Sequence, residues 1–185
     1  TRCLSDWSSD VCSSDLIGEY ARERRIFVPV SEMPDQVKQA FLSAEDKTFY
    51  SHPGVDIFGI MRAVLNDVRN ADRRPQGAST ITQQVARNFL LSNEVKFSRK
   101  IREMVLAMRI DGAFSKDHIL ELYLNEIFLG ENSYGVAAAS MNYFGKTLDE
   151  LTLSQTAFLA GLPKAPANYS PTRHKEAAIK IGRAH

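Results

Sequence analysis

The segment PDQVKQAFLSAEDKTFYSHPG, residues 34–54, decides the fold class because it joins a helical pattern to a polar turn. Apolar side chains recur at the spacing i, i+3, i+4 and i+7, at Val37, Ala40, Phe41 and Ala44. This spacing predicts an amphipathic helix, and Pro34 is a favoured residue for its first turn. We expect the helix to end near Glu45 and Asp46, so that the acid pair lies at a helix exit.

A second polar segment, GASTITQQ at residues 77–84, opens the next helical pattern. Ser79 is a suitable N-cap for a helix over residues 79–91. The apolar stripe of this helix is Ile81, Val85 and Phe89, and a polar stripe beside it is Thr80, Gln83, Gln84 and Arg87. Polar side chains are costly to bury, so we expect the polar stripe to line a wet cleft for a ligand rich in hydroxyl, amide or phosphate groups.

The rest of the chain predicts further helices separated by turns. The periodic segments are residues 57–70, 98–113, 115–129, 133–144 and 151–162, the last with Thr147 or Asp149 as its cap. A short extended segment is expected at residues 26–30, and the Pro- and Gly-containing residues 71–78 predict a mobile loop. Because no convincing strand ladder is present, we predict an all-α fold without a second domain.

The helix over residues 98–113 carries apolar residues on two sides. One face is Ile101, Met104, Val105 and Met108, and the other is Glu103 with Leu106, Ala107 and Ile110. A helix that is apolar on both sides is expected to be buried. Glu103 would then be partly buried and would need a cation nearby, for which Arg99 lies one turn earlier.

Composition limits the class of protein. The chain has 185 residues, of which 44% are hydrophobic and 24% charged, as is ordinary for one globular domain. A net charge of +1 argues against a nucleic-acid partner. Residues 1–16 and 181–185 break the pattern of the rest, and we interpret both as non-native, adapter-derived sequence, which leaves residues 17–180 as the domain. Both cysteines, Cys3 and Cys12, lie in the first of these segments.

Glu45 is the first candidate for chemistry. A carboxylate after an amphipathic helix is commonly a solvated surface charge. However, His52, Pro53 and Gly54 follow closely and can turn the chain back over the acid. Glu45 is then a candidate general base, with His52 as a hydrogen-bonding support.

Arg99, Lys100 and Glu103 form the second candidate group. Their spacing also fits a surface salt bridge on a helix. The functional alternative uses the cations to stabilise a departing phosphate, with Glu103 orienting them or holding a divalent ion. No Gly-rich nucleotide loop is present, so no nucleotide cofactor is expected. Two separated carboxylates also fit a glycoside hydrolase, which stays open as the alternative.

Five motifs in order then carry a family resemblance. They are EDKTFYSHPGVD at 45–56, GASTITQQ at 77–84, RKIREMVLAMRID at 99–111, KDHILELYLNEIFLG at 116–130 and LSQTAFLAGLPKAP at 153–166. The chain resembles the peptidoglycan glycosyltransferases of glycosyltransferase family 51, the transglycosylase module of class A penicillin-binding proteins. The resemblance covers residues 26 to 180.

The resemblance implies a lysozyme-like, two-lobed helical domain with a substrate cleft and a small membrane-facing lobe. It implies that lipid II is polymerised into glycan strands, the growing chain on undecaprenyl pyrophosphate being the donor. By similarity, Glu45 deprotonates the acceptor 4-hydroxyl, which attacks the donor with inversion. Glu103, the second catalytic residue, would assist departure of the pyrophosphate together with Arg99 and Lys100.

The same resemblance implies the remaining site residues and partners. The substrate-binding set is Asp46, Phe49, His52, Ser79, Thr80, Gln83, Gln84, Arg87, Arg99, Lys100 and Asn125, of which the first three would also support Glu45. The position of Arg87 is more often Lys in the family. A divalent cation, Mg2+ or Mn2+, is expected at Glu103. The expected partners are lipid II, the nascent glycan strand, the membrane surface through an anchor, and other cell-wall synthesis proteins, on the periplasmic face of the bacterial inner membrane.

Three functions therefore remain in view. The first is an active glycosyltransferase module. The second is a binding module that holds lipid II or a cell-wall partner without turnover, although a pure binder has no need of a positioned base. The third is a muramidase-like hydrolase on the same fold, which would release reducing ends from finished glycan.

Overall fold

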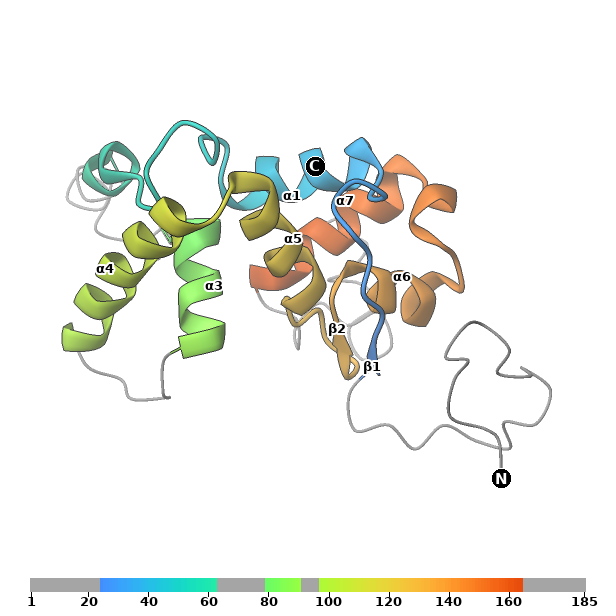
Figure 1. The fold of residues 1–185 in the computed structure, drawn as a ribbon. Coiled ribbons are helices and arrows are strands. Elements are labelled where there is room, and N and C mark those ends of the chain that lie inside the picture. Colours follow the sequence, from blue (N-terminus) through green and yellow to red (C-terminus); the bar gives the residue numbers. More distant parts are fainter. Residues whose placement is uncertain (1–23, 63–78, 91–96, 165–185) are drawn as a thin grey trace, which may run out of the picture.

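The computed structural model describes residues 24–62, 79–90 and 97–164, and this part of the chain is mostly helical (Figure 1). On one side lie α3 (Ile81–Leu90), α4 (Phe97–Ala113) and a helical segment at residues 57–62. On the other side lie α1 (Asp35–Glu45), α5 (Lys116–Glu126), α6 (Val136–Phe144) and α7 (Leu153–Gly161). We call the first group the α3–α4 lobe and the second the helical bundle.

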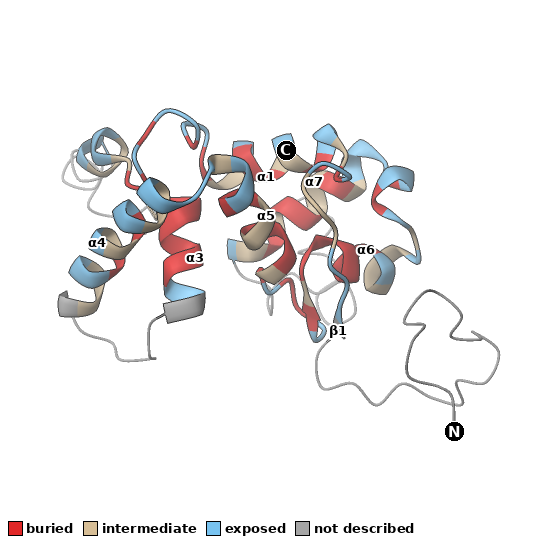
Figure 2. Ribbon diagram, viewed as in Figure 1, coloured by how far each residue is buried: buried red, intermediate tan, exposed pale blue. Residues whose placement is uncertain are grey.

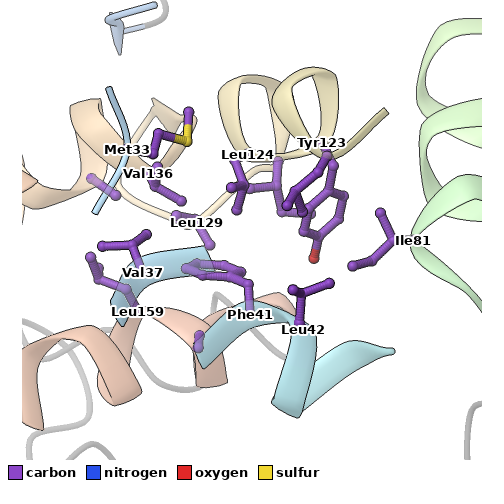
Figure 3. Close-up of a cluster of buried hydrophobic side chains, with 14 of the residues drawn as sticks. Met33, Val37, Phe41, Leu42, Ile81, Tyr123, Leu124, Leu129, Val136 and Leu159 are labelled. Carbon is purple, nitrogen blue, oxygen red and sulfur yellow. The ribbon is translucent and has the colours of Figure 1, made fainter. Parts of the chain in front are cut away.

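The bundle is built around α1, whose apolar stripe packs as predicted. Val37 and Phe41 are fully buried, and α1 ends at Glu45 with Asp46 as its C-cap residue. Figure 3 shows their side chains facing those of α5 and α7 across an apolar core. Full burial of such a side chain stabilises the fold by about 1.5–3 kcal/mol, so this core holds the end of α1 in place.

Short capping motifs fix the ends of the other bundle helices. The Ser115 side chain accepts a hydrogen bond from the backbone N–H of His118 and caps α5. Thr152 forms a capping box with Gln155 at the start of α7. The predicted cap Thr147 instead opens a separate 3-10 helix, η1 (Leu148–Glu150). A second 3-10 helix, η2 (Leu162–Lys164), follows α7.

One small sheet departs from the all-α prediction. Strand β1 (Arg24–Arg25) pairs in parallel with β2 (Ser133–Tyr134), and for this reason α6 begins three residues later than the helix predicted at 133. The extended segment that follows β1 is held by a side chain. The Asn125 amide accepts from the Val28 N–H at 2.9 Å and donates to the Val28 carbonyl at 2.9 Å.

The α4 prediction was wrong on one face. Ile101, Val105 and Met108 are 41–52% exposed, whereas Glu103 and Ala107 are buried. The polar–small face packs inward because α4 lies directly against α3, and small side chains allow that close approach. The apolar stripe therefore lies at the surface of the lobe, where exposed α4 residues are drawn in Figure 2.

The α3 prediction also needs correction. Every residue from Thr80 to Ala86 is buried, so most of the polar stripe lies inside the protein, and of its four members only Arg87 is exposed. Figure 2 draws most of α3 as buried. The cap of α3 is Thr80, not Ser79. Thr80 and Gln83 form a reciprocal pair, with Thr80 N donating to Gln83 Oε1 at 2.9 Å and Gln83 N donating to Thr80 Oγ1 at 3.2 Å.

Several predictions fall outside the described residues. These are the second half of the helix at 57–70, the loop at 71–78, and the two segments interpreted as non-native, residues 1–16 and 181–185. Within the part of the chain that the structure describes, no helix has the length and apolar character needed to cross a membrane.

Candidate active site

Glu45 is the last residue of α1 and is partly buried. Its Oε2 accepts a hydrogen bond from Gln84 Nε2 of α3 at 2.8 Å. Its Oε1 is buried and has no hydrogen-bond partner among the described residues. The structure thus places the predicted base where the bundle meets the α3–α4 lobe.

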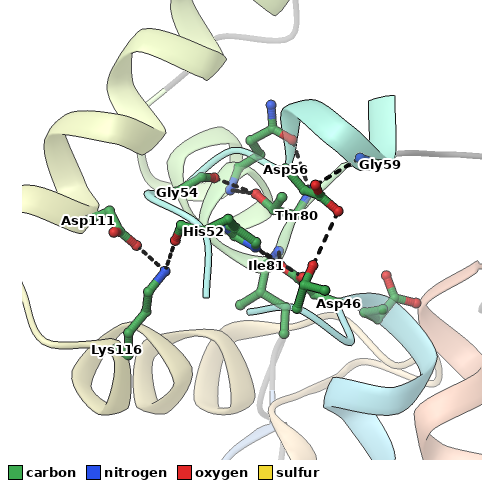
Figure 4. Close-up of polar contacts among 12 residues, drawn as sticks. Asp46, His52, Gly54, Asp56, Gly59, Thr80, Ile81, Asp111 and Lys116 are labelled. Atoms are coloured by element: carbon green, nitrogen blue, oxygen red, sulfur yellow. Dashed lines mark hydrogen bonds and ion pairs between the residues drawn. The ribbon is translucent and has the colours of Figure 1, made fainter. Parts of the chain in front are cut away.

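Asp46, the next residue, is buried and serves the fold. Its Oδ2 lies 3.0 Å from His52 Nε2 and accepts a hydrogen bond from the Ile81 N–H at 3.1 Å (Figure 4). Ile81 is the first residue of α3, so the carboxylate caps a helix N-terminus, where negative charge is stabilised. Asp46 and His52 therefore support Glu45 from inside, and we do not assign them a direct contact with substrate.

The loop between α1 and the helical segment at 57–62 is fastened at Gly54. The Thr80 hydroxyl donates to the Gly54 carbonyl at 2.6 Å (Figure 4). Gly54 has a φ of +79°, and a Cβ on it would lie 2.5 Å from the carbonyl oxygen of Ala107. Only glycine fits this approach to α4, so the loop that follows Glu45 is locked to both helices of the lobe.

Lys116 is a site residue for which no role was predicted from the sequence patterns. Its Nζ donates to the His52 carbonyl at 2.7 Å, pairs with Asp111 Oδ1 at 2.5 Å, and lies 4.7 Å from the centre of the buried Phe49 ring. Figure 4 shows it reaching from the start of α5 to the loop. Its position in the motif KDHILELYLNEIFLG was the available signal, but two of its three partners, His52 and Phe49, are more than 60 residues away in sequence.

Glu103 is fully buried and forms an ion pair with Lys100, one turn earlier on α4. Lys100 Nζ also donates to Ser79 Oγ at 2.8 Å. The predicted partner, Arg99, does not take this place, and its Nε is buried without a hydrogen-bond partner in the described residues. Ser79, Lys100 and Glu103 thus form a second polar group at the start of α3.

The described residues do not fit a resident divalent cation. Among them no group of three His, Cys, Asp or Glu side chains could hold a metal ion. The carboxylate of Glu103 is already neutralised by Lys100. The predicted cation at Glu103 therefore stays a prediction, and no chemical step is derived through it.

The side-chain amide of Asn125 makes its hydrogen bonds to backbone groups of the fold. Besides both Val28 contacts, its Nδ2 donates to the Glu121 carbonyl at 2.9 Å. Its amide is committed to backbone groups, so we assign it a structural role in place of the predicted substrate contact.

Tyr123 of α5 is a second residue for which the sequence patterns predicted no place in the site. Its hydroxyl is buried and has no hydrogen-bond partner in the described part of the chain. Burial raises the pKa of Tyr123 well above its usual value, and the charge of Glu45 raises the pKa further. A phenol next to a carboxylate inside the protein is thus kept protonated.

Comparisons with known proteins agree with this picture. A family model described as transglycosylase matches residues 13–184, a wider range than the predicted 17–180. Penicillin-binding protein 1A of Rickettsia bellii is 53% identical over 161 residues, which are 86% of this chain and 20% of that protein. Penicillin-binding protein 1A of Neisseria flavescens is 49% identical over 175 residues, 95% of this chain and 21% of that protein.

A solved structure shows the same fold. The crystal structure of penicillin-binding protein 1A from Haemophilus influenzae matches with a TM-score of 0.50 and 30% identity, covering 91% of this chain and 15% of that one. The predicted all-α, lysozyme-like class is thereby confirmed. The chain spans about a fifth of the length of the curated relatives that it matches.

Proposed function

The chain belongs to the transglycosylase family, and from that premise we propose that it is a peptidoglycan glycosyltransferase that polymerises lipid II into glycan strands. One observation carries the proposal. Glu45 ends α1 partly exposed, with Oε2 held at 2.8 Å by Gln84. A partly exposed carboxylate that is fixed by a neighbouring amide is suited to accept a proton from a bound hydroxyl.

In the proposed reaction, Glu45 removes the proton of the acceptor 4-hydroxyl as its oxygen attacks the anomeric carbon of the donor. The bond from that carbon to the pyrophosphate oxygen breaks, and the configuration inverts. The acid–base contribution of such a group is typically about 100- to 10,000-fold in rate.

Departure of the pyrophosphate is assigned to the second polar group. Lys100 is part-exposed and Arg99 partly buried, so both cations can approach an anion without full desolvation. Glu103 would hold Lys100 in place through their ion pair. Arg87, which is exposed in the last turn of α3, is a further candidate for contact with phosphate or sugar.

The partners and location follow the same proposal. Lipid II and the nascent glycan strand would be the substrates, at the periplasmic face of the bacterial inner membrane. Mg2+ or Mn2+ would enter with the pyrophosphate, since the described residues alone supply no metal site. Other cell-wall synthesis proteins are proposed as partners on the family premise alone.

Incubation of the protein with labelled lipid II, with and without Mg2+, tests the proposal. We expect glycan products of increasing length, resolved by electrophoresis. A parallel incubation with finished glycan, followed by an assay for new reducing ends, examines the hydrolase alternative. Reducing ends without polymer would replace the transferase by a muramidase-like enzyme, and binding of lipid II without any product would favour the binding module.

A further inference from the structure

The two carboxylate oxygens of Glu45 are in different situations. Oε2 accepts a hydrogen bond from Gln84 Nε2 at 2.8 Å, whereas Oε1 is buried with no partner among the described residues. A buried carboxylate oxygen without a donor is costly and seldom tolerated. A donor for Oε1 is therefore expected from the surrounding helices.

Tyr123 is well placed to be that donor. Its ring packs edge-on against Phe41, with centroids 6.3 Å apart. Phe41 and Glu45 are four residues apart on α1 and so lie on the same face of that helix. Figure 3 shows the Tyr123 hydroxyl directed towards the C-terminal part of α1, between Leu42 and Ile81.

The charges around the phenol agree with this placement. The groups that act on Tyr123 are, after burial itself, the carboxylate of Glu45, the opposing guanidinium of Arg87 and the carboxylate of Asp46. The phenol thus remains a protonated donor beside the negative end of the site. Its own hydroxyl, like Glu45 Oε1, has no partner among the residues that the structure describes.

We propose that Gln84 and Tyr123 are positioning residues that hold Glu45 from two sides, Gln84 directly at Oε2 and the Tyr123 hydroxyl through one bridging water at Oε1. The inference rests on the proposed function, since it explains how the base of that reaction is oriented. The two contacts together fix the plane of the carboxylate towards the acceptor hydroxyl. Misplacement of a reacting group by about 1 Å can cost about 100-fold in rate.

Tyr123→Phe tests this directly because it removes the hydroxyl and keeps the ring. We expect kcat for lipid II polymerisation to fall about 10- to 100-fold with KM nearly unchanged. The thermal midpoint should stay the same or rise, since a hydroxyl without a protein partner is removed. A wild-type kcat in this variant would overturn the inference.

Tyr143→Phe is the matched control. The Tyr143 hydroxyl donates to the Leu129 carbonyl at 2.8 Å, in the bundle. We expect this variant to lower the thermal midpoint and leave kcat unchanged. The opposite responses of the two Tyr→Phe variants separate a positioning role from a merely structural one.

Two further variants test whether Gln84 and Tyr123 act on the same group, the carboxylate of Glu45. Gln84→Met should also lower kcat, and the double variant with Tyr123→Phe should lose less than the product of the two separate losses, because both act on one carboxylate. A loss of kcat in the double variant equal to the product of the two single losses would contradict the two-sided arrangement. If wild-type protein makes no polymer, the proposed function fails and this inference falls with it, whereas an active wild type with an unaffected Tyr123→Phe overturns the inference alone.

Discussion

The helical bundle and the α3–α4 lobe treat buried polar groups differently. In the bundle, Ser140 donates to the Lys146 carbonyl at 2.6 Å, and Thr156 donates to the Thr152 carbonyl at 3.1 Å. Among the described residues, the buried side-chain atoms that lack partners lie mainly on α3, on α4 and in the loop after α1, and the two on bundle helices are in Glu45 and Tyr123. They belong to Glu45, His52, Thr82, Gln83, Arg99 and Tyr123.

This difference separates a part built for stability from a part built for chemistry. Unpaired buried groups cost free energy, so a fold keeps them mainly where another requirement outweighs the cost. Here two of them belong to Glu45, the residue that we propose as the base, and to Tyr123, whose pKa the charge of Glu45 raises. Substitutions in the bundle should therefore act mainly on stability, whereas substitutions near Glu45 and Glu103 should also affect activity.

Leu124→Ala should have the largest effect on stability. Leu124 is fully buried in the apolar core of the bundle. We expect a loss of about 2–5 kcal/mol in the free energy of unfolding, measured by urea denaturation. Leu153→Ala is the control, since Leu153 is 70% exposed and should change stability by no more than about 0.5 kcal/mol. Equal losses in the two variants would contradict the assigned core.

Lys100→Met should cause the next largest loss of stability, because it leaves the buried carboxylate of Glu103 without its cation. Removal of one partner of a fully buried pair costs about 3–5 kcal/mol, and the 44% exposure of the Lys100 side chain reduces the expected loss to about 1–3 kcal/mol. Adding Glu103→Gln should recover part of it in the same urea assay. Failure of the second change to recover any stability would show that the two residues are not coupled.

Lys116→Met should cost about 1–2 kcal/mol, since it removes the charged donor that ties the His52 carbonyl to Asp111. The rate of lipid II polymerisation should fall as well, because the loop after Glu45 loses its contact with α5. Lys116→Arg keeps the charge and should recover part of both losses. Activity that is unchanged in Lys116→Met would show that the loop does not depend on this contact.

The smallest effect is expected at alkaline pH. Burial, with the charge of Glu131 as a lesser cause, raises the pKa of Tyr143 to about 12 from an ordinary 10.0. The folded protein therefore holds this proton more tightly than the unfolded chain does, and the associated stability is full below pH 10 and is lost as pH rises towards 12. Unfolding midpoints measured from pH 9 to 12 should fall less steeply in Tyr143→Phe; parallel curves would contradict the prediction.

The helices and the place of the acid pair Glu45–Asp46 at the end of α1 could be predicted from the sequence because both follow local rules. The stripe of α1 and the acid pair at its end depend only on spacing along one helix. The partners of those residues were not predictable in the same way. Lys116, Tyr123 and Ile81 reach the Glu45 region from other elements, and such contacts depend on how helices pack.

Two errors have the same physical origin. The polar stripe of α3 was expected to face a wet cleft, but side-chain hydrogen bonds such as the Thr80–Gln83 pair allow it to be buried. The apolar stripe of α4 was expected to be buried, yet α3 packs against the opposite face, which carries Glu103 and Ala107. Periodicity identifies the faces of a helix, and packing decides which of them turns inward.

The most direct test compares the rate of polymer formation from lipid II by wild-type protein and by Glu45→Gln at matched concentration. The substitution keeps the shape of the side chain and removes its ability to accept a proton. We predict a loss of about 100- to 10,000-fold in rate, with an unfolding midpoint close to that of the wild type. A Glu45→Gln variant that polymerises lipid II at the wild-type rate would contradict the assignment of Glu45 as the base.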